Sequence, residues 1–358
     1  LKRLNGTRQK WETSDMSQYI LIKKLNVQNA NAIAGLTYGF PAITNFLGFA
    51  HALSRKLPAS LNVNLGGVVV ISHKNQVHAR QPKGWGDYVF ALTRNPLCKK
   101  VKSNADLYDK KGNLKTASIN EEGRMNMQIS LLVEVKGLIV ADTLTETDLK
   151  AHLKRLIPML RLAGGQILGF EACELLNTEE QQAYALRRLM PGFVLMDRHE
   201  YLAAHFEQRK AEQDDVCLFD AWCDFATLTY RANPSEHQQT EDTVEAEQAI
   251  VKANWEYVPK PNAGYLVPIA TGFCAISPLY EAGEVANVRD NTVPVTFAET
   301  AYSVGEWQSV HRLHHIETAL WRYTDNHPWY IATTNELKQP IIEPDFIDSE
   351  AAFNPDNY

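Results

Sequence analysis

Hydrophobic and polar residues alternate most regularly in residues 127–136. Met127, Ile129, Leu131, Val133 and Val135 are separated by polar residues, and only Leu132 breaks the pattern. Successive side chains of a strand point to opposite faces of the sheet, so this period of two predicts a half-buried β-strand.

Other segments with clear hydrophobic patterns predict three more strands and two helices. Residues 19–27, 68–72 and 165–170 are short apolar runs of the strand type. Apolar residues recur with helical spacing in residues 42–56, and again after Thr145 up to a bend or end near Pro158. The resulting order is strand, helix, strand, insert, strand, helix, strand. We therefore expect an α+β fold that begins with a ferredoxin-like or RRM-like βαββαβ domain.

The second half of the chain predicts a mixed α/β elaboration. Residues 178–230 predict three helices around a strand at 192–197, followed by a β-rich stretch that includes 264–280 and a helix around 310–323. A further strand candidate lies within the insert at 88–94. The expected organisation is an extension, non-native or disordered, at 1–15, an RRM-like domain at 16–175 with a thumb insert around 95–125, a helical and then β-rich part at 176–335, and an acidic tail at 336–358.

Charge and composition change this picture in two ways. The formal net charge of −6 is concentrated in residues 236–247 and 341–358, which hold five acidic residues each and no Lys or Arg. Without these ten acids the remainder carries a charge of +4, so the mean charge does not exclude a nucleic-acid ligand. No apolar run approaches the roughly 20 residues that span a bilayer, so we expect no membrane association.

Five cysteines without a CxxC pair argue against a disulfide framework and against a common zinc site. We therefore expect a reducing, cytoplasmic location. Three histidines at 311, 314 and 315 with Glu317 nearby have helical metal-ligand spacing, but they lack the acid inside an HExxH motif. Surface or interface histidines are the favoured interpretation, and we expect no metal and no cofactor.

Residues 99–115 are the most basic segment of the chain. They contain six lysines, including Lys99, Lys100 and Lys102, against two acids, around a DKKGN turn signal. An extended basic hairpin that binds phosphates without reading bases is one interpretation. An ordinary solvated loop is the other.

A glycine-rich turn joins the second predicted helix to the last predicted strand of the first domain. It contains Arg161, Gly164, Gly165 and Gln166. Its glycines allow close backbone approach, and its N–H groups could hold a phosphate or a base edge, but a tight connecting turn has the same sequence signature. The glycines follow a helix and precede a strand, which is the reverse of the dinucleotide-binding order.

Catalytic motifs are absent from the sequence. It contains no GxSxG and no P-loop. A general acid–base nuclease needs only one or two histidines near a phosphate, and His51, His73 and His78 all lie in the first domain. His51 precedes Arg55 by one helical turn on the side opposite the apolar stripe, which suits either a ligand contact or solvent exposure.

Six separated segments resemble one family. They are residues 26–53, 92–97 (LTRNPL), 121–135 (EEGRMNMQISLLVEV), 161–165 (RLAGG), 187–193 and 265–290. In this order they are similar to the second-subunit family of the Csy complex, the five-type backbone subunit of type I-F CRISPR surveillance assemblies. The resemblance runs from about residue 19 to about residue 315.

The resemblance implies an RRM-like, non-catalytic subunit with an inserted thumb. Such subunits bind the 5′ handle of the CRISPR RNA, pair with the large subunit, lie next to the first repeated backbone subunit, and meet target double-stranded DNA only through the assembly. Carried onto this chain, the resemblance implies RNA contacts from loop amides, arginines, the glycine-rich turn and the basic insert. The expected residues are Gln28, Asn29, Asn31, Arg55, Arg94, Lys99, Lys100, Lys102, Arg161, Gly164, Gly165, Gln166 and Arg289.

Two alternatives stay open at this point. Related five-type subunits of another subtype are metal-independent endoribonucleases that process the precursor RNA, and a nuclease of this kind would depend on His51 or His78. A protein-bridging scaffold with incidental RNA contact is the third interpretation. For each arginine, a structural salt bridge is the alternative to an RNA contact.

Overall fold

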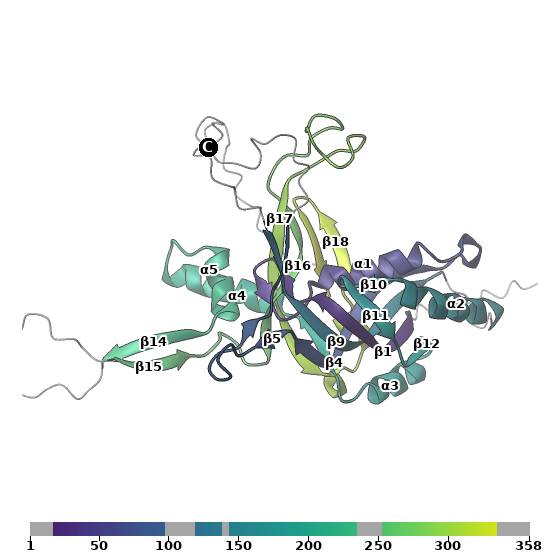
Figure 1. The fold of residues 1–358 in the computed structure, drawn as a ribbon, viewed down its shortest axis with the longest axis horizontal. Helices are drawn as coiled ribbons and strands as arrows, with labels where there is room; N and C mark the ends of the chain where they lie inside the picture. The colour runs from purple at the N-terminus through teal and green to yellow at the C-terminus, as the bar shows by residue number, and fades with distance from the viewer. Residues whose placement is uncertain (1–16, 97–118, 138–142, 235–252, 335–358) are drawn as a thin grey trace, which may run out of the picture.

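The computed structural model describes residues 17–96, 119–137, 143–234 and 253–334. The lysine-rich segment 99–115, the acidic segment 236–247, the extension 1–15 and the tail 336–358 lie outside these ranges. The described part is a mixed α/β structure built on a large, curled antiparallel sheet of eleven strands (Figure 1).

Three long strands form the centre of this sheet. They are β1 (Gln18–Asn31), β9 (Arg124–Lys136) and β4 (Asn64–Val77), in that spatial order. On its other side, β1 pairs with β12 (Ala172–Leu176) along its first half and with β11 (Gly165–Gly169) along its second half. The short β10 (Arg161–Leu162) pairs antiparallel with β11. The strands predicted at 19–27, 68–72, 127–136 and 165–170 are confirmed.

Two helices cover one face of these strands. They are α1 (Ile43–Ser54) and α2 (Thr143–Leu156), which ends in a 3-10 turn, η3 (Ile157–Met159), that contains Pro158. Their apolar stripes pack on the inward residues of β1, β4 and β9 in one hydrophobic core. The predicted helices 42–56 and after Thr145 are thus confirmed.

A second core covers only half of the opposite face. Helix α3 (Glu179–Arg188) and two 3-10 turns, η4 (Val310–Arg312) and η5 (Ile316–Ala319), pack on Tyr19 and Leu21 of β1 and on their neighbours. The other half of this face, toward the end of β1 and the start of β9, remains uncovered by the described residues.

The C-terminal strands continue the same sheet beyond β4. The order runs through β13 (Phe193–Asp197), β17 (Ala298–Ser309), β16 (Leu266–Ala275), β19 (Trp329–Thr333) and β18 (Arg322–Asn326). Glu134 of β9 accepts two hydrogen bonds from Arg322, at 3.2 and 2.9 Å. The expected boundary near residue 175 stays a prediction, but the two halves share a sheet and this ion pair.

Smaller elements project from the body. Helices α4 (His199–Glu212) and α5 (Leu218–Ala226) enclose a third apolar cluster, and the hairpin of β14 (Thr229–Pro234) and β15 (Ala253–Val258) follows α5. Short two-stranded pairs join β2 (Ile33–Ala34) to β3 (Thr37–Tyr38), β5 (Ala79–Arg80) to β6 (Val89–Phe90), and β7 (Thr93–Pro96) to β8 (Ile119–Glu122). One more 3-10 turn, η1 (Ala59–Leu61), follows α1.

Two sequence predictions are wrong. The segment 88–94 is not one strand, because Tyr88 and Leu92 are exposed and the residues divide between β6 and β7. The helix predicted around 310–323 is replaced by η4, η5 and the start of β18. Its buried residues Val310, Leu313, Ile316 and Ala319 are spaced by three, which matches the three residues per turn of a 3-10 helix.

Candidate nucleic-acid interface

Polar side chains line the uncovered half of the sheet. They alternate with core residues such as Val27 and Met127, and strand pairing aligns Asn26 of β1 with Gln128 of β9 and Lys74 of β4. The next row includes Asn126 of β9 opposite Gln76 of β4. We call this surface the polar sheet face; its members are Asn26, Gln28, Lys74, Gln76, Asn126 and Gln128.

A bulge in β1 brings more amide groups to this face. The pairing of β1 with β9 shifts register between Val27 and Ala30, and Asn29 within the bulge has a φ of 57°. Asparagine tolerates this left-handed conformation better than most residues. The Asn29 N–H donates to Oδ1 of Asn126 at 3.1 Å, and Gln128 donates to Oδ1 of Asn26 at 2.9 Å. These bonds hold two amide side chains of β9 in fixed orientations.

Arg124 lies where the polar sheet face meets the end of β1. Its guanidinium donates to Oδ1 of Asn31 at 2.7 Å, to the carbonyl oxygen of Asn29 at 3.3 Å, and to the carboxylate of Glu122. This residue is not among the contacts predicted from the sequence. The available signal was its place at a polar position of the alternating strand, directly before Met125.

The glycine-rich turn packs against the same end of β1. The Asn31 N–H donates to the Ala163 carbonyl oxygen at 2.8 Å, and Ala163 and Gly164 have φ values of 50° and 76°. A methyl group at Gly165 would lie 2.7 Å from the carbonyl oxygen of Gln28, so only glycine allows this approach. Gln166 pairs with Gln28 on one side and with Arg161 on the other.

The structure thus joins two sequence segments whose nearest residues, Asn31 and Arg161, are 130 positions apart. Seven of the predicted contact residues lie together at the end of β1: Gln28, Asn29, Asn31, Arg161, Gly164, Gly165 and Gln166. Gln28, Arg161 and Gln166 are exposed, and among the described residues their side chains have no hydrogen-bond or ion-pair partner. Free amides can hydrogen-bond to base edges, and a free guanidinium can bind a phosphate.

An aromatic loop borders the polar sheet face beyond the end of β4. The hairpin of β5 and β6 presents Trp85 and Tyr88, which are 70% and 71% exposed, and Lys83 lies 5.4 Å above the Trp85 ring. Backbone bonds tie this hairpin to the site, because His78 N–H donates to the Arg124 carbonyl oxygen at 2.9 Å. We call residues 80–90 the aromatic loop. Exposed rings beside a cation suit base stacking.

Comparison with known proteins assigns the family. The model of the family described as CRISPR-associated protein (Cas_Csy2) matches residues 20–331. The chain belongs to this family. It is 35% identical over 323 residues to the CRISPR-associated protein Csy2 of Pseudomonas aeruginosa (strain UCBPP-PA14), which covers 86% of this chain and 92% of that protein. The resemblance read from the sequence is confirmed, and the chain is a subunit of a type I-F CRISPR–Cas complex.

The remaining predicted residues of this Csy2-family chain lie elsewhere or outside the description. Lys99, Lys100 and Lys102 lie outside the described residues, and Arg94 is placed only by its backbone, which pairs with Glu121 across β7 and β8. Their roles stay predictions.

Arg55 lies at the opposite end of the sheet from Arg124. Ser54, the preceding residue, accepts a hydrogen bond from Leu65 N–H at 3.0 Å, and Leu65 pairs with Val135 near the end of β9. Arg124 starts β9, so almost the whole length of that strand, at about 3.3 Å per residue, separates the two arginines. The structure does not bring Arg55 to the polar sheet face.

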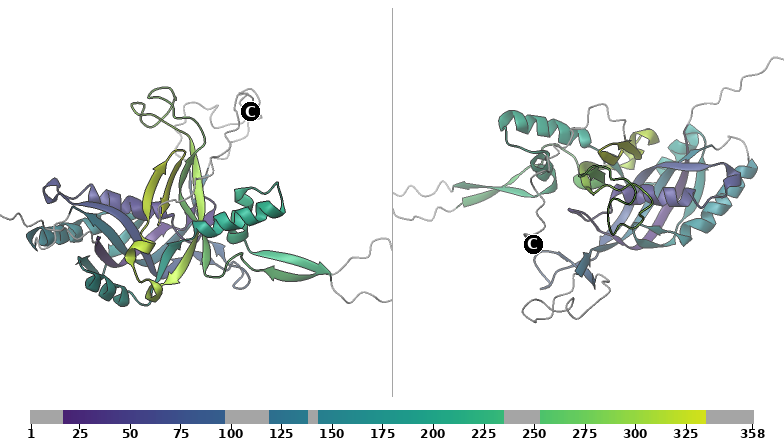
Figure 2. Two further views of the ribbon diagram at one scale, coloured as in Figure 1. Left: turned by 180° about the vertical axis from the view of Figure 1, so that it is seen from behind. Right: turned by 90° about the horizontal axis from the view of Figure 1, so that it is seen from above.

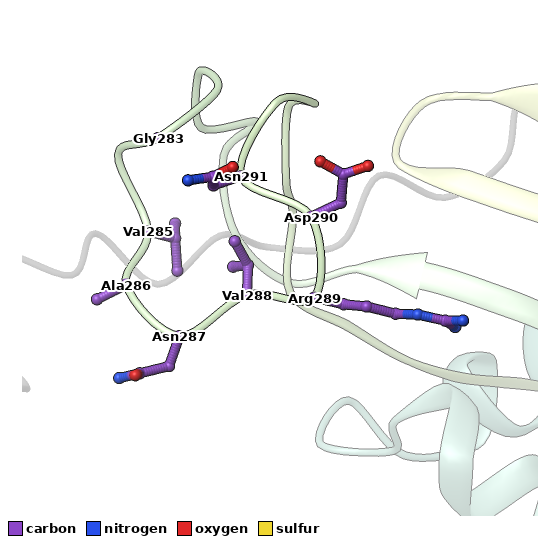
Figure 3. Close-up of a pocket in the computed structure, with 8 residues that line it drawn as sticks. All are labelled: Gly283, Val285, Ala286, Asn287, Val288, Arg289, Asp290 and Asn291. Carbon is purple, nitrogen blue, oxygen red and sulfur yellow. The ribbon is translucent and has the colours of Figure 1, made fainter.

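Arg289 lies on the loop that connects β16 to β17. Figure 3 shows a shallow pocket formed by Gly283 and residues 285–291, from which the Arg289 side chain points outward. Figures 1 and 2 show the loop projecting beyond these two strands. No hydrogen bond or strand pairing within the described residues joins it to the polar sheet face.

The histidines of the first domain do not form a common site. His51 lies on α1, behind the sheet, whereas His73 contacts Ser130 at 2.7 Å and the Pro191 carbonyl oxygen at 2.9 Å on the opposite face. The Pro191 carbonyl can only accept, so Nδ1 carries the proton and Nε2 accepts from Ser130. Burial lowers the pKa of His73, and both of its ring nitrogens are already engaged.

The described part of the chain bears on two further expectations from the sequence, a metal site and membrane association. It contains no group of three or more His, Cys, Asp or Glu side chains able to hold a metal ion. His311 instead contacts the Ser309 hydroxyl at 2.7 Å. Over the same residues, no helix combines the length and the apolar character needed to cross a membrane.

Proposed function

We propose that this chain binds the 5′ handle of a CRISPR RNA on its polar sheet face and does not cleave it. The observation that carries the proposal is that the β1 bulge, Arg124 and the glycine-rich turn meet at one end of the uncovered sheet face. Fixed amides there can read the edges of unpaired bases, and the free Arg161 and Lys74 can neutralise phosphates.

The order of the N-terminal strands supports an RRM-like, ferredoxin-like core. The strand segments β1, β4, β9 and β11/β12 lie in the spatial order β11/β12, β1, β9, β4, and both helices pack on one face. RNA would then bind the face opposite the helices, as in an RRM. This face has amides where an RRM has stacking aromatics, so stacking would fall to Trp85 and Tyr88 of the aromatic loop.

The preorganised hydrogen bonds support sequence-selective binding rather than a purely electrostatic contact. Asn126, Gln128 and Asn31 are already held by neighbours, so little side-chain entropy is lost when RNA binds. The lysines of residues 99–115 would add phosphate contacts that are independent of sequence. We expect handle preference with a modest dependence on salt.

Within the assembly, we propose pairing with the large subunit, contact with the first repeated backbone subunit, and access to target double-stranded DNA only through the complex. A cytoplasmic location suits the four cysteines of the described residues, all of which are free thiols. Residues 16–175 would form the RNA-binding part and 176–335 the part that faces other subunits.

A binding assay with labelled RNA tests this proposal. RNA with an intact 5′ handle is compared with RNA of equal length and composition whose handle is scrambled, at several salt concentrations. We expect at least tenfold tighter binding of the intact handle and full-length RNA after incubation. Equal binding of both RNAs would mean that the site is only a basic surface without handle preference. RNA cleavage that is lost on substitution of His51 or His78 would establish the endoribonuclease alternative.

A further inference from the structure

Asn126 of the polar sheet face and the neighbouring Asn31 each hold their side-chain amide in one direction. Oδ1 of Asn126 accepts the Asn29 backbone N–H at 3.1 Å. Oδ1 of Asn31 accepts from the Arg124 guanidinium at 2.7 Å. A backbone N–H and a guanidinium can only donate, so the acceptor in each bond must be the amide oxygen. The NH2 group of each amide is therefore the end left for a ligand.

Both NH2 groups lie on the same side of the sheet. Asn31 is aligned with Arg124 across β1 and β9, and Asn126 follows Arg124 by two residues. Side chains two residues apart on a strand share a face, so Asn31 and Asn126 border one surface. Among the described residues neither NH2 group has a hydrogen-bond acceptor, and neither is enclosed by the protein. A base that reaches this surface therefore meets two donors that cannot turn over without breaking an existing bond.

The other polar groups of the face do not cancel this bias toward donors. Asn26 and Gln128 hydrogen-bond to each other at 2.9 Å, and whichever amide donates, the pair leaves one NH2 group and one carbonyl oxygen free. Gln28 and Gln76 are exposed without a partner among the described residues, so their amides can rotate to offer either group. The ammonium group of Lys74 only donates. The groups whose direction is fixed are thus donors in excess.

Hydrogen-bond donors distinguish the four RNA bases by one exocyclic group. Guanine and uracil carry a carbonyl oxygen, an acceptor, at the position where adenine and cytosine carry an amino group, a donor. An amide NH2 group can bond to that oxygen, whereas facing an amino group it leaves two donors without acceptors. Two fixed amide donors are therefore complementary to guanine and uracil.

We propose that Asn31 and Asn126 select guanine and uracil among the unpaired bases of RNA bound on the polar sheet face. The inference rests on the proposed function, because it takes RNA as the ligand of this face. It adds the class of base that is read and the two side chains that read it. Arg161 and Lys74 contribute affinity without affecting this choice, because every nucleotide has the same phosphate.

Homopolymer RNA tests the base preference without any change to the protein. The full chain is titrated with labelled oligouridine and oligocytidine of equal length, which share one backbone and one ring size and differ in the hydrogen-bonding edge of the base. We expect oligouridine to bind about three- to tenfold more tightly, the usual net effect of one hydrogen bond. Replacing adenosine with inosine in an unstructured mixed-sequence RNA puts a carbonyl oxygen in place of the amino group and should tighten binding similarly.

Two aspartate variants connect the preference to the named side chains. Asn126→Asp replaces the free NH2 group with an oxygen and keeps the acceptor for the Asn29 N–H. Asn31→Asp makes the same exchange and keeps the acceptor for Arg124. Each variant should reduce the preference for oligouridine over oligocytidine, and the two substitutions together should abolish or reverse it.

Asn75→Asp is the matched control, because it makes the same substitution on the neighbouring strand β4. Asn75 pairs with Met127, which packs in the core, so the two side chains project from the face opposite to Asn126. The added negative charge weakens binding of both RNAs alike, and the ratio of their affinities should stay as in the wild-type chain. An equal change of the ratio in this variant would assign the preference to charge and overturn the proposal.

Two further outcomes would overturn the proposal. One is equal binding of oligouridine and oligocytidine by the wild-type chain, and the other is an undiminished preference in both aspartate variants. The assay with a scrambled handle keeps this inference separate from the proposed function, because a scrambled handle contains the same bases in another order. Uridine preference together with equal binding of intact and scrambled handles would contradict handle binding and support the selection of bases.

Discussion

Arg124 at the start of β9 donates a 2.7 Å hydrogen bond to the side chain of Asn31 at the end of β1. The same guanidinium bonds to the Asn29 carbonyl oxygen and to Glu122, so one side chain fixes the bulge of β1 and the edge of the polar sheet face. A single lost contact to a base or phosphate of RNA costs about 1–3 kcal/mol.

We therefore expect Arg124→Ala to weaken binding of the intact handle about 10- to 100-fold. Arg124→Lys should recover only part of this loss, because an ammonium cannot reproduce the fork in which one nitrogen bonds to Asn31 and Asn29 and the other to Glu122. Filter binding or mobility shift measures both variants. Arg187→Ala, at an exposed position of α3, is the control; an equal loss there would mean that only total charge matters.

The aromatic loop gives a second prediction about RNA. Trp85→Ala and Tyr88→Ala should each weaken binding of single-stranded handle RNA by about 1–3 kcal/mol, the usual contribution of one stacked base. Fluorescence of 2-aminopurine placed in the handle reports stacking directly and should rise in these variants. Tyr265→Ala, which removes a ring that is also 71% exposed, is the control. Unchanged fluorescence in both loop variants would contradict base stacking at the loop.

Two glycines of β11 differ in the space available for a side chain. A methyl group at Gly165 would lie 2.7 Å from the Gln28 carbonyl oxygen and 2.8 Å from Ala30 N, whereas one at Gly169 meets nothing within 4 Å. Gly165→Ala should therefore lower the free energy of unfolding by about 1–3 kcal/mol. Gly169→Ala should be neutral or slightly stabilising. Urea denaturation measures both, and equal effects would contradict the close approach of β11 to β1.

The ion pair between Glu134 and Arg322 predicts a specific acid sensitivity. Burial raises the pKa of Glu134, but hydrogen bonds from Arg322 and from the Gly67 N–H outweigh it and hold the pKa below its usual value. A carboxylate with a lower pKa in the folded state stabilises that state above its unfolded pKa of about 4.3. This stabilisation is lost as pH falls through the folded pKa.

Glu134→Gln should therefore lower stability by about 2 kcal/mol at neutral pH and reduce the loss of stability between neutral and acidic pH. Chemical denaturation at a series of pH values measures this difference. Glu207→Gln, an exposed position on α4, is the control and should keep the wild-type pH dependence. Parallel pH curves for wild type and Glu134→Gln would show that the pair does not couple the two halves of the sheet.

Periodicity in the sequence predicted much of the N-terminal fold, because each long strand and helix there packs one face into the same core. The one break in the alternation, Leu132, lies in the second core on the opposite face. The alternation of Met127, Ile129 and Leu131 is a direct record of that burial. It could not predict that β13 would pair with β4, since long-range pairing leaves no local pattern. In residues 310–319, a spacing of three also fits the α-helical pattern closely enough to mislead.

The candidate site was predicted in pieces. The Gln28–Asn31 loop and the glycine-rich turn were separate weak signals, and only the position of β11 beside β1 brings them together. The polar position of Arg124 in the alternating strand did not reveal its role, because that role depends on the bulge at Gln28 and Asn29. Arg55 was a reasonable exposed cation on α1, but the direction of that helix carries it to the other end of the sheet.

Crosslinking of handle RNA tests the central claim most directly. CRISPR RNA with 4-thiouridine at single handle positions is bound to the full chain, irradiated, and the modified peptides are identified by mass spectrometry. We predict crosslinks within residues 26–31, 124–128 and 161–166, with some in the aromatic loop, and their loss when the handle is scrambled. Crosslinks confined to α3, α4 or the β14–β15 hairpin would contradict RNA binding on the polar sheet face.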